Sequence, residues 1–163
     1  MEIFKNKKIL ITGHTGFKGS WLSIWLTHLG AKVVGVSNNI VGSPSNFLVS
    51  EISKVVDDYR FDIRDEGAIK SLIERVQPDF VFHLAAQALV RPSYENPLET
   101  MSINAIGSAN VLDALRGLDK KVVAVMITSD KAYDNVEWVW GYRETDRLGG
   151  KDPYSSSKGM AEL

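Results

Sequence analysis

The sequence contains no cysteine. This absence excludes disulfides, thiolate metal sites and cysteine nucleophiles, and it fits a reducing compartment. Long hydrophobic runs are also missing, because the longest, Val122–Ile127, falls far short of the ~20 apolar residues that span a bilayer. The first residues lack the apolar stretch of a signal peptide. We therefore predict a soluble, cytoplasmic protein that enters no membrane.

An excess of charge of one sign is absent as well. Nineteen Lys and Arg residues face twenty Asp and Glu residues, for a formal net charge of -1. A chain so balanced has no global field that favours nucleic acid or an anionic membrane as a partner. The three histidines, His14, His28 and His83, do not have the spacing of metal ligands, so we predict no metal site.

Short apolar segments rich in β-branched residues alternate with segments of helical period along the 163 residues. This alternation is typical of βαβ units and hence of a parallel sheet. The expected strands are 8–12, 32–36, 59–62, 79–84 and 121–127, and the expected helices are 17–29, 65–76 and 97–115. Residues 38–50 and 132–153 are expected to be loops, and the last ten residues to begin another helix. The predicted fold class is α/β, a doubly wound parallel-sheet Rossmann fold with at least five strands in the order 3-2-1-4-5.

Three glycines, Gly13, Gly16 and Gly19, follow the first strand and open the first helix. Glycine is needed where a backbone must approach a phosphate closely with its N–H groups free. The segment, with Thr15 and Phe17 in it, therefore predicts a binding site for the diphosphate of a dinucleotide. A tight connection without a ligand remains the alternative. The spacing of three residues resembles the short-chain dehydrogenase/reductase superfamily.

The second strand is followed by neither an acidic residue for the ribose of NAD nor an arginine for the 2′-phosphate of NADP. Ser37 or Asn38 would have to contact the ribose, and the lack of a basic residue favours NAD. Asp62 and Ile63 match the position at which the superfamily contacts the adenine amino group. A turn or helix cap is the alternative role of Asp62.

Tyr154 and Lys158 are four residues apart, on one face of the expected last helix. An adjacent cation stabilises tyrosinate, so the phenolate could take a proton from a sugar hydroxyl. An ordinary surface pair is the alternative. Ser129 closes the fifth strand, at the sheet edge where ligands bind in such folds. Asn104 would complete the superfamily's tetrad, with an exposed helix asparagine as its alternative.

Four segments, Thr12–Leu22, His83–Gln87, Thr128–Asn135 and Trp138–Glu144, together resemble the CDP-glucose 4,6-dehydratase family of extended short-chain dehydrogenases/reductases. The resemblance covers essentially the whole chain. It implies an enzyme that holds NAD and converts CDP-glucose to CDP-4-keto-6-deoxyglucose. The implied steps are oxidation at C4, loss of water across C5 and C6, and return of the hydride to C6.

The same resemblance implies roles for individual residues. Tyr154 would take the proton of the C4 hydroxyl, Lys158 would activate it and contact the ribose, and Ser129 would orient the hydroxyl. Asp130 would protonate the departing C6 oxygen. Lys131 stands where the dTDP-glucose dehydratases have a glutamate that removes the C5 proton, and it would serve as that base or only pair with Asp130. The predicted cofactor contacts are Gly13, Thr15, Gly16, Phe17, Gly19, Ser37, Asp62, Ile63, Ala85, Ala86, Asn104, Tyr154 and Lys158.

Members of the family continue about as long again, with a sugar-nucleotide-binding domain. We therefore expect residues 1–163 to be the NAD(P)-binding Rossmann domain of a longer homo-oligomeric protein, and to be inactive alone. The fifth strand should form an open apolar edge. Two other functions remain open. A nucleotide-sugar 4-epimerase or another extended relative would not need Asp130, and a non-catalytic NAD(P)-binding module would not need the Tyr154–Lys158 pair.

Overall fold

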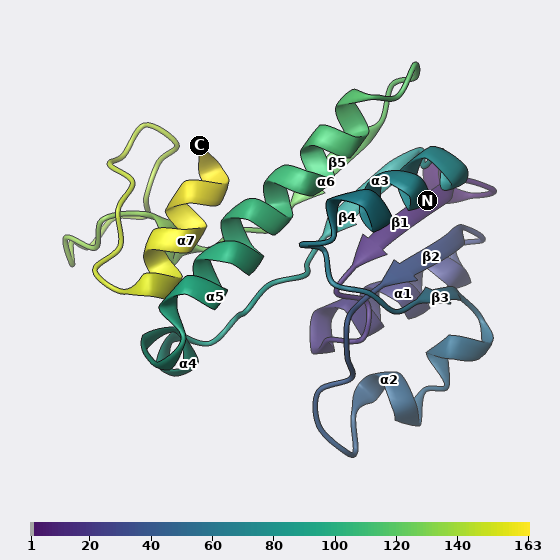
Figure 1. Ribbon diagram of the computed structural model, residues 1–163, viewed down its shortest axis with the longest axis horizontal. Coiled ribbons are helices and arrows are strands. Elements are labelled where there is room, and N and C mark those ends of the chain that lie inside the picture. Colours follow the sequence, from purple (N-terminus) through teal and green to yellow (C-terminus); the bar gives the residue numbers. More distant parts are fainter. Residues whose placement is uncertain (1) are drawn as a thin grey trace. The chain divides into compact units, whose positions relative to one another are not determined.

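The computed structural model describes residues 2–163, which form a five-stranded parallel sheet with helices on both sides. The strands are β1 (Lys8–Thr12), β2 (Lys32–Val36), β3 (Asp57–Tyr59), β4 (Phe80–His83) and β5 (Val123–Met126). Their order is β3-β2-β1-β4-β5, and every neighbouring pair is parallel. Figure 1 shows the arrangement. The predicted Rossmann fold and strand order are confirmed.

The described residues divide into two compact units, one of residues 2–85 and 110–127 and one of residues 86–109 and 128–163. The first unit contains the sheet. Its helices are α1 (Phe17–His28), α2 (Asn46–Val49), α3 (Glu66–Val76) and the larger part of α6 (Gly107–Arg116), with single 3₁₀ turns at Glu2–Phe4 and Ile52–Lys54. Right-handed crossovers from β1 outward in each direction place α1 and α2 on one face of the sheet and α3 and α6 on the other.

The core of the first unit follows from the alternation of side chains along each strand. One sheet face buries Ile9, Ile11 and Val33 against Leu26 of α1 and Phe47 of α2. The other face is equally apolar, with Leu10, Val34, Val81, Ile69, Leu72, Ile73 and Val111 buried. Because helices cover both faces of the sheet, the central strands have hydrophobic residues at successive positions of their sequence.

The second unit consists of helices and irregular chain. Its elements are α4 (Val90–Glu95), α5 (Pro97–Met101), a π-helical turn (Ser102–Ile106), a 3₁₀ turn (Asp130–Ala132) and α7 (Pro153–Glu162). α7, yellow in Figure 1, packs against α4, α5, the π-helical turn and the 3₁₀ turn. Residues 133–152 are irregular apart from one bridge between Tyr133 and Leu148.

Several expected boundaries differ from the structure. The expected loop at 38–50 contains the short helix α2, since the Ser45 hydroxyl accepts a hydrogen bond from the Leu48 N–H and caps it. The third strand lies at 57–59 rather than 59–62, because Asp62 turns the chain by bonding the Arg64 N–H. The expected helix 97–115 is interrupted by the π-helical turn, and it is preceded by the separate helix α4.

Trp21 and Trp25 of α1 do not pack in the core. They are 55% and 49% exposed, and Phe17, one turn earlier, is 75% exposed. α1 instead buries Gly19, Ser20 and Ser23. Small residues on this face let the helix approach the sheet closely, so the bulky aromatic side chains lie on its outer face.

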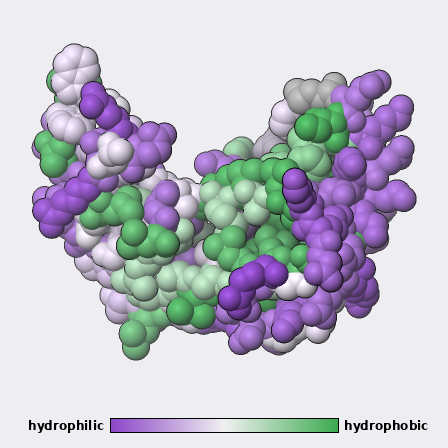
Figure 2. All heavy atoms as spheres, turned by 90° about the horizontal axis from the view of Figure 1, so that it is seen from above, coloured by the Kyte–Doolittle hydropathy of each residue, from purple (hydrophilic) through white to green (hydrophobic). Residues whose placement is uncertain are grey.

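β5 is the outermost strand of the described sheet, as expected, and its edge is apolar. Val123, Val125 and Ile127 are 53%, 37% and 37% exposed. Figure 2 shows that hydrophobic residues reach the molecular surface elsewhere as well, next to an area of hydrophilic residues. None of the helices within residues 2–163 is long and apolar enough to cross a membrane, and no group of three or more His, Cys, Asp or Glu residues there could hold a metal ion.

Candidate active site

The turn between β1 and α1 needs glycine at two positions for the fold itself. Gly13 has a φ of +75°, and a Cβ there would lie 2.7 Å from the backbone nitrogen of Ala85. A Cβ on Gly19 would lie 2.1 Å from the carbonyl oxygen of Gly13. Because backbone atoms cannot give way, any side chain at either position would push the turn, the helix and the end of β4 apart.

Gly16 differs from the other two glycines. Its φ is -70°, a value open to any residue, and a Cβ there would meet only the Gly13 carbonyl oxygen, at 3.3 Å. Gly16 is the N-cap of α1 and offers no side-chain acceptor to the first N–H groups of the helix. A helix start without a side-chain cap fits an anion such as a diphosphate, because the N–H groups of its first turn have no partner within the helix.

The turn is tied to the chain that follows β2. The Thr15 N–H donates to the Ser37 hydroxyl at 3.4 Å, and the Thr15 hydroxyl donates to the Asn39 carbonyl at 2.7 Å. Both Thr15 and Ser37 are buried. The structure thus brings together the glycine turn and the residue predicted to contact the ribose.

Asp62 and Ile63 lie between β3 and α3. The Arg64 guanidinium holds both carboxylate oxygens of Asp62, at 3.0 and 2.7 Å, and this hydrogen bonding lowers the pKa of Asp62. The Asp62 carboxylate also accepts the Arg64 N–H, so it makes the turn that was the alternative reading. Ile63 is buried. A contact of this pair with adenine stays a prediction.

The sequence patterns do not predict the position of His14, which lies inside the glycine turn. The ring is fully buried, and its Nε2 lies 2.9 Å from Oδ1 of Asp58. It lies on Gly35 of β2, where a Cβ would come within 2.3 Å of the ring. A glycine inside a strand is a signal of such close approach, and Gly35 could have indicated it. Burial lowers the pKa of His14.

The buried His14 makes stability depend on pH. The unfolded chain takes up a proton at His14 below about pH 6.5, whereas the folded chain does so only at lower pH. The free energy of unfolding should therefore fall as the pH falls below about 6.5. Urea denaturation over pH should show a shallower decrease for His14→Gln. His28→Gln, at an exposed position, is the control and should leave the wild-type slope. An unchanged slope in His14→Gln would contradict the prediction.

Tyr154 and Lys158 lie on α7 in the second unit, and both are buried, at 8% and 5% exposure. α7 begins here because Asp152 accepts the Ser155 N–H at 3.0 Å and Pro153 occupies its first position. The Tyr154 N–H donates to the Ser93 hydroxyl at 3.2 Å. The pair is therefore not an exposed surface pair. Burial lowers the pKa of Lys158, and the charge of Glu162 opposes this effect.

The chain from Thr128 onward also belongs to the second unit. The Ser129 hydroxyl caps the 3₁₀ turn by accepting the Lys131 N–H at 3.2 Å, and it donates to Asp130 Oδ1 at 3.1 Å. This turn packs against α7. Lys131 is exposed. Among the ion pairs of residues 2–163, none joins Lys131 to Asp130. The Asp130 carboxylate is therefore oriented by Ser129.

Asn104 is fully buried, so the alternative of an exposed helix asparagine is wrong. Its side-chain oxygen accepts the Gln87 N–H at 2.8 Å, and its amide donates to the Gln87 carbonyl at 3.0 Å and to the Ser157 hydroxyl at 2.8 Å. It lies in the π-helical turn, a feature that often marks functional sites. Asn104 thus joins the segment after β4 to α7, between Tyr154 and Lys158.

Replacing Asn104 by Ala should lower the free energy of unfolding by about 2–4 kcal/mol. The change leaves the partly buried N–H and carbonyl of Gln87 without their side-chain partner, and it removes one of the two hydrogen bonds of the buried Ser157 hydroxyl. Urea denaturation measures the loss. Asn110→Ala is the control, since partly exposed Asn110 donates two hydrogen bonds, to the Ile63 and Arg64 carbonyls at 3.1 and 3.2 Å. We expect about 1 kcal/mol for it. Equal losses in the two variants would show that Asn104 is no more than an ordinary helix residue.

The predicted site residues fall into two groups. The first unit contains the glycine turn, Ser37, Asp62, Ile63 and Ala85. Ala85 lies behind Gly13, and its N–H donates to the Thr12 hydroxyl at 3.2 Å. Phe17 is on the outer surface of α1. The second unit contains Ala86, Asn104, Ser129, Asp130, Lys131, Tyr154 and Lys158.

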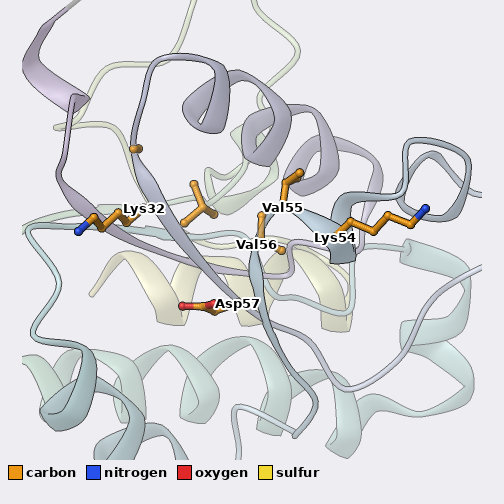
Figure 3. A pocket seen from close by; sticks show the side chains of 7 residues that line it. Lys32, Lys54, Val55, Val56 and Asp57 are labelled. Carbon is orange, nitrogen blue, oxygen red and sulfur yellow. The ribbon is translucent and has the colours of Figure 1, made fainter.

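A hollow lies at the other end of β2 and β3, and Figure 3 shows it from close by. Its lining consists of Ala31, Lys32, Val33, Lys54, Val55, Val56 and Asp57. The ammonium groups of Lys32 and Lys54 extend away from one another in this view. None of the predicted site residues lines it, and ligands of open α/β sheets bind at the carboxyl ends of the strands. This hollow is therefore not the candidate active site.

Known proteins include relatives that match nearly the whole chain. Residues 10–163 match the family model described as GDP-mannose 4,6 dehydratase. The chain is 48% identical to CDP-glucose 4,6-dehydratase of Salmonella typhimurium, over 99% of this chain and 45% of that protein. It is 30% identical to GDP-mannose 4,6-dehydratase of Yersinia enterocolitica, over 93% of this chain and 43% of that protein. The chain thus spans slightly less than half the length of these relatives.

Solved structures of epimerases have the same fold. The UDP-glucose 4-epimerase of Thermus thermophilus, in complex with NAD, superposes with a TM-score of 0.81 at 30% identity, over 95% of this chain and 48% of that one. The UDP-glucose 4-epimerase of Brucella ovis, also in complex with NAD, gives 0.81 at 26% identity, over 96% and 46%. The chain therefore belongs to the GDP-mannose 4,6-dehydratase family of NAD-dependent epimerases and dehydratases, as a homologue of CDP-glucose 4,6-dehydratase.

Proposed function

We propose that this chain is the cofactor-binding half of an NAD-dependent lyase that converts CDP-glucose to CDP-4-keto-6-deoxyglucose. The observation that carries the proposal is the buried Tyr154–Lys158 pair on α7, packed against the turn in which Ser129 orients Asp130. The 48% identity to a CDP-glucose 4,6-dehydratase supports the choice of substrate.

The residues of the first unit fit a dinucleotide. The N–H groups of the first turn of α1, after Gly16, would hold the diphosphate, Ser37 the adenosine ribose, and Asp62 with Ile63 the adenine. When bound, NAD supplies the acceptor for the hydride that leaves the sugar and later returns to it.

The residues of the second unit would move the protons. The Tyr154 phenolate would take the proton of the C4 hydroxyl, which Ser129 would orient, and the Lys158 ammonium would stabilise the phenolate. Asp130 would donate a proton to the C6 oxygen, which leaves as water. Lys131 would take the proton from C5, which the neighbouring C4 ketone makes acidic.

A 4-epimerase is the second candidate, because the solved structures that share the fold include UDP-glucose 4-epimerases. It would use the tyrosine and lysine in the same way. It removes no oxygen from C6, however, and so gives Asp130 nothing to protonate. A binding module without catalysis would not need to bury a lysine beside a tyrosine, which costs free energy.

The test is incubation of the full-length protein with CDP-glucose, GDP-mannose and UDP-glucose in separate reactions, followed by measurement of 4-ketosugar formation. We expect a 4-keto-6-deoxy product from CDP-glucose alone. Inversion at C4 without loss of water would favour the epimerase, and no reaction with any of the three would contradict both. Residues 1–163 alone should give no turnover. Assembly into a homo-oligomer and a cytoplasmic location stay predictions.

A further inference from the structure

A charged pair lies beside the segment that follows β2. Nη2 of Arg60 is 2.7 Å from Oδ2 of Asp58, and Nη1 of Arg60 is 3.5 Å from the carbonyl oxygen of Asn39. The guanidinium also lies over the Phe47 ring, 4.9 Å from its centre. A carboxylate, a carbonyl and an aromatic face therefore hold Arg60 in one place.

This place is the ribose end of the predicted dinucleotide site. The Asn39 carbonyl that Arg60 approaches also accepts the Thr15 hydroxyl from the glycine turn, at 2.7 Å. In dinucleotide-binding folds, the chain after the second strand supplies an acidic residue for the ribose 2′-hydroxyl of NAD, or an arginine lies near for the 2′-phosphate of NADP. Here Ser37 follows β2, and the arginine is Arg60, the residue that follows β3.

We propose that Arg60 is the residue able to bind an adenosine 2′-phosphate at this site, and that its ion pair with Asp58 prevents this binding. The Asp58–Arg60 pair thereby sets a preference for NAD over NADP. The inference rests on the proposed dinucleotide-binding function and names a specificity determinant of that site.

Asp58 is well placed for this role. Its charge neutralises Arg60 and would repel the negative 2′-phosphate. It cannot turn away easily, because its other oxygen, Oδ1, lies 2.9 Å from Nε2 of the fully buried His14. The Asp58 side chain is only 18% exposed, whereas that of Arg60 is 32% exposed and remains open to a ligand.

The test replaces Asp58 by Asn in the full-length protein. Asparagine keeps the shape and an oxygen for His14 but removes the charge that holds Arg60. Calorimetric titration should show about tenfold tighter binding of NADP and of adenosine 2′,5′-bisphosphate, and NAD affinity within about twofold of the wild type. Added salt should reduce the gain, since Arg60 and the phosphate meet near solvent.

Two variants serve as controls. Asp113→Asn breaks a similar pair on α6, where Asp113 Oδ1 lies 2.6 Å from Nη2 of Arg116, and it should leave all three affinities unchanged. Asp58→Asn combined with Arg60→Met should lose the gain for the phosphorylated ligands.

The outcomes separate the inference from the function on which it rests. If NAD binds but Asp58→Asn improves NADP affinity no more than Asp113→Asn does, the inference is wrong and the proposed function stands. The inference is also wrong if the gain survives Arg60→Met. A folded wild-type protein that binds neither NAD nor NADP would overturn the proposed function, and the inference with it.

Discussion

Asp130→Asn in the full-length protein is expected to lower product formation from CDP-glucose by about 10²–10⁴-fold. The change removes the proton donor for the departing C6 oxygen but leaves the groups that act at C4. Substrate should therefore still be oxidised, and the near-ultraviolet absorbance of reduced nicotinamide should rise without product. Rapid mixing with CDP-glucose, followed by absorbance and by product assay, measures both quantities.

Tyr154→Phe is the matched comparison, because it removes the base for the first step and leaves the ring in its buried position. Neither the absorbance rise nor the product is expected for it. Wild-type product formation by Asp130→Asn would remove Asp130 from the elimination step. A loss of both signals in Asp130→Asn would instead place Asp130 at the C4 step.

Gly16→Val should weaken NAD binding by about 2 kcal/mol or more, which is roughly 30-fold in affinity, without unfolding the protein. Gly16 is suited to this test because its φ of -70° admits valine and only the Gly13 carbonyl lies near a Cβ there, at 3.3 Å. The new side chain would occupy the space beside the free N–H groups at the start of α1. Calorimetry with NAD measures the affinity, and circular dichroism checks the fold.

Gly67→Ala on α3 is the control, since a Cβ there would meet only the Asp65 carboxylate, at 3.6 Å. It should leave NAD affinity unchanged. Gly19→Ala, in contrast, should disrupt the fold, because its Cβ would overlap the Gly13 carbonyl. Unchanged NAD affinity in a folded Gly16→Val variant would remove the diphosphate from this turn.

Local patterns in the sequence predict much of the fold. β1 and β2 have the expected bounds, and the start of α1 coincides with the expectation as well. These elements are fixed by short-range physics, since a buried parallel strand needs a continuous β-branched run and a helix after Gly16 needs a tight turn. Where a polar side chain bonds its own backbone, as at Ser45 and Asp62, the boundaries shift by a few residues.

The polar partners of the candidate site could not be predicted in the same way. His14 meets Asp58 across 44 positions in the sequence, and Asn104 meets Ser157 across 53. No periodicity encodes such pairs, because they form only when packing brings separate elements together. The burial of Asn104 and Lys158 and the exposure of Trp21 and Trp25 depend on the same long-range packing.

The sequence by itself therefore determined the class of fold, the strand order, the glycine turn and the family of this protein. Each of these rests on residues close together in the chain, or on strings of residues that relatives share. Only the tertiary structure decided that Gly13 and Gly19 are required by close backbone packing while Gly16 is not, and that Asp58 holds Arg60 beside the Asn39 carbonyl. The physical reason is that free space, burial and charge pairing are properties of packed surfaces, and residues distant in sequence create those surfaces together.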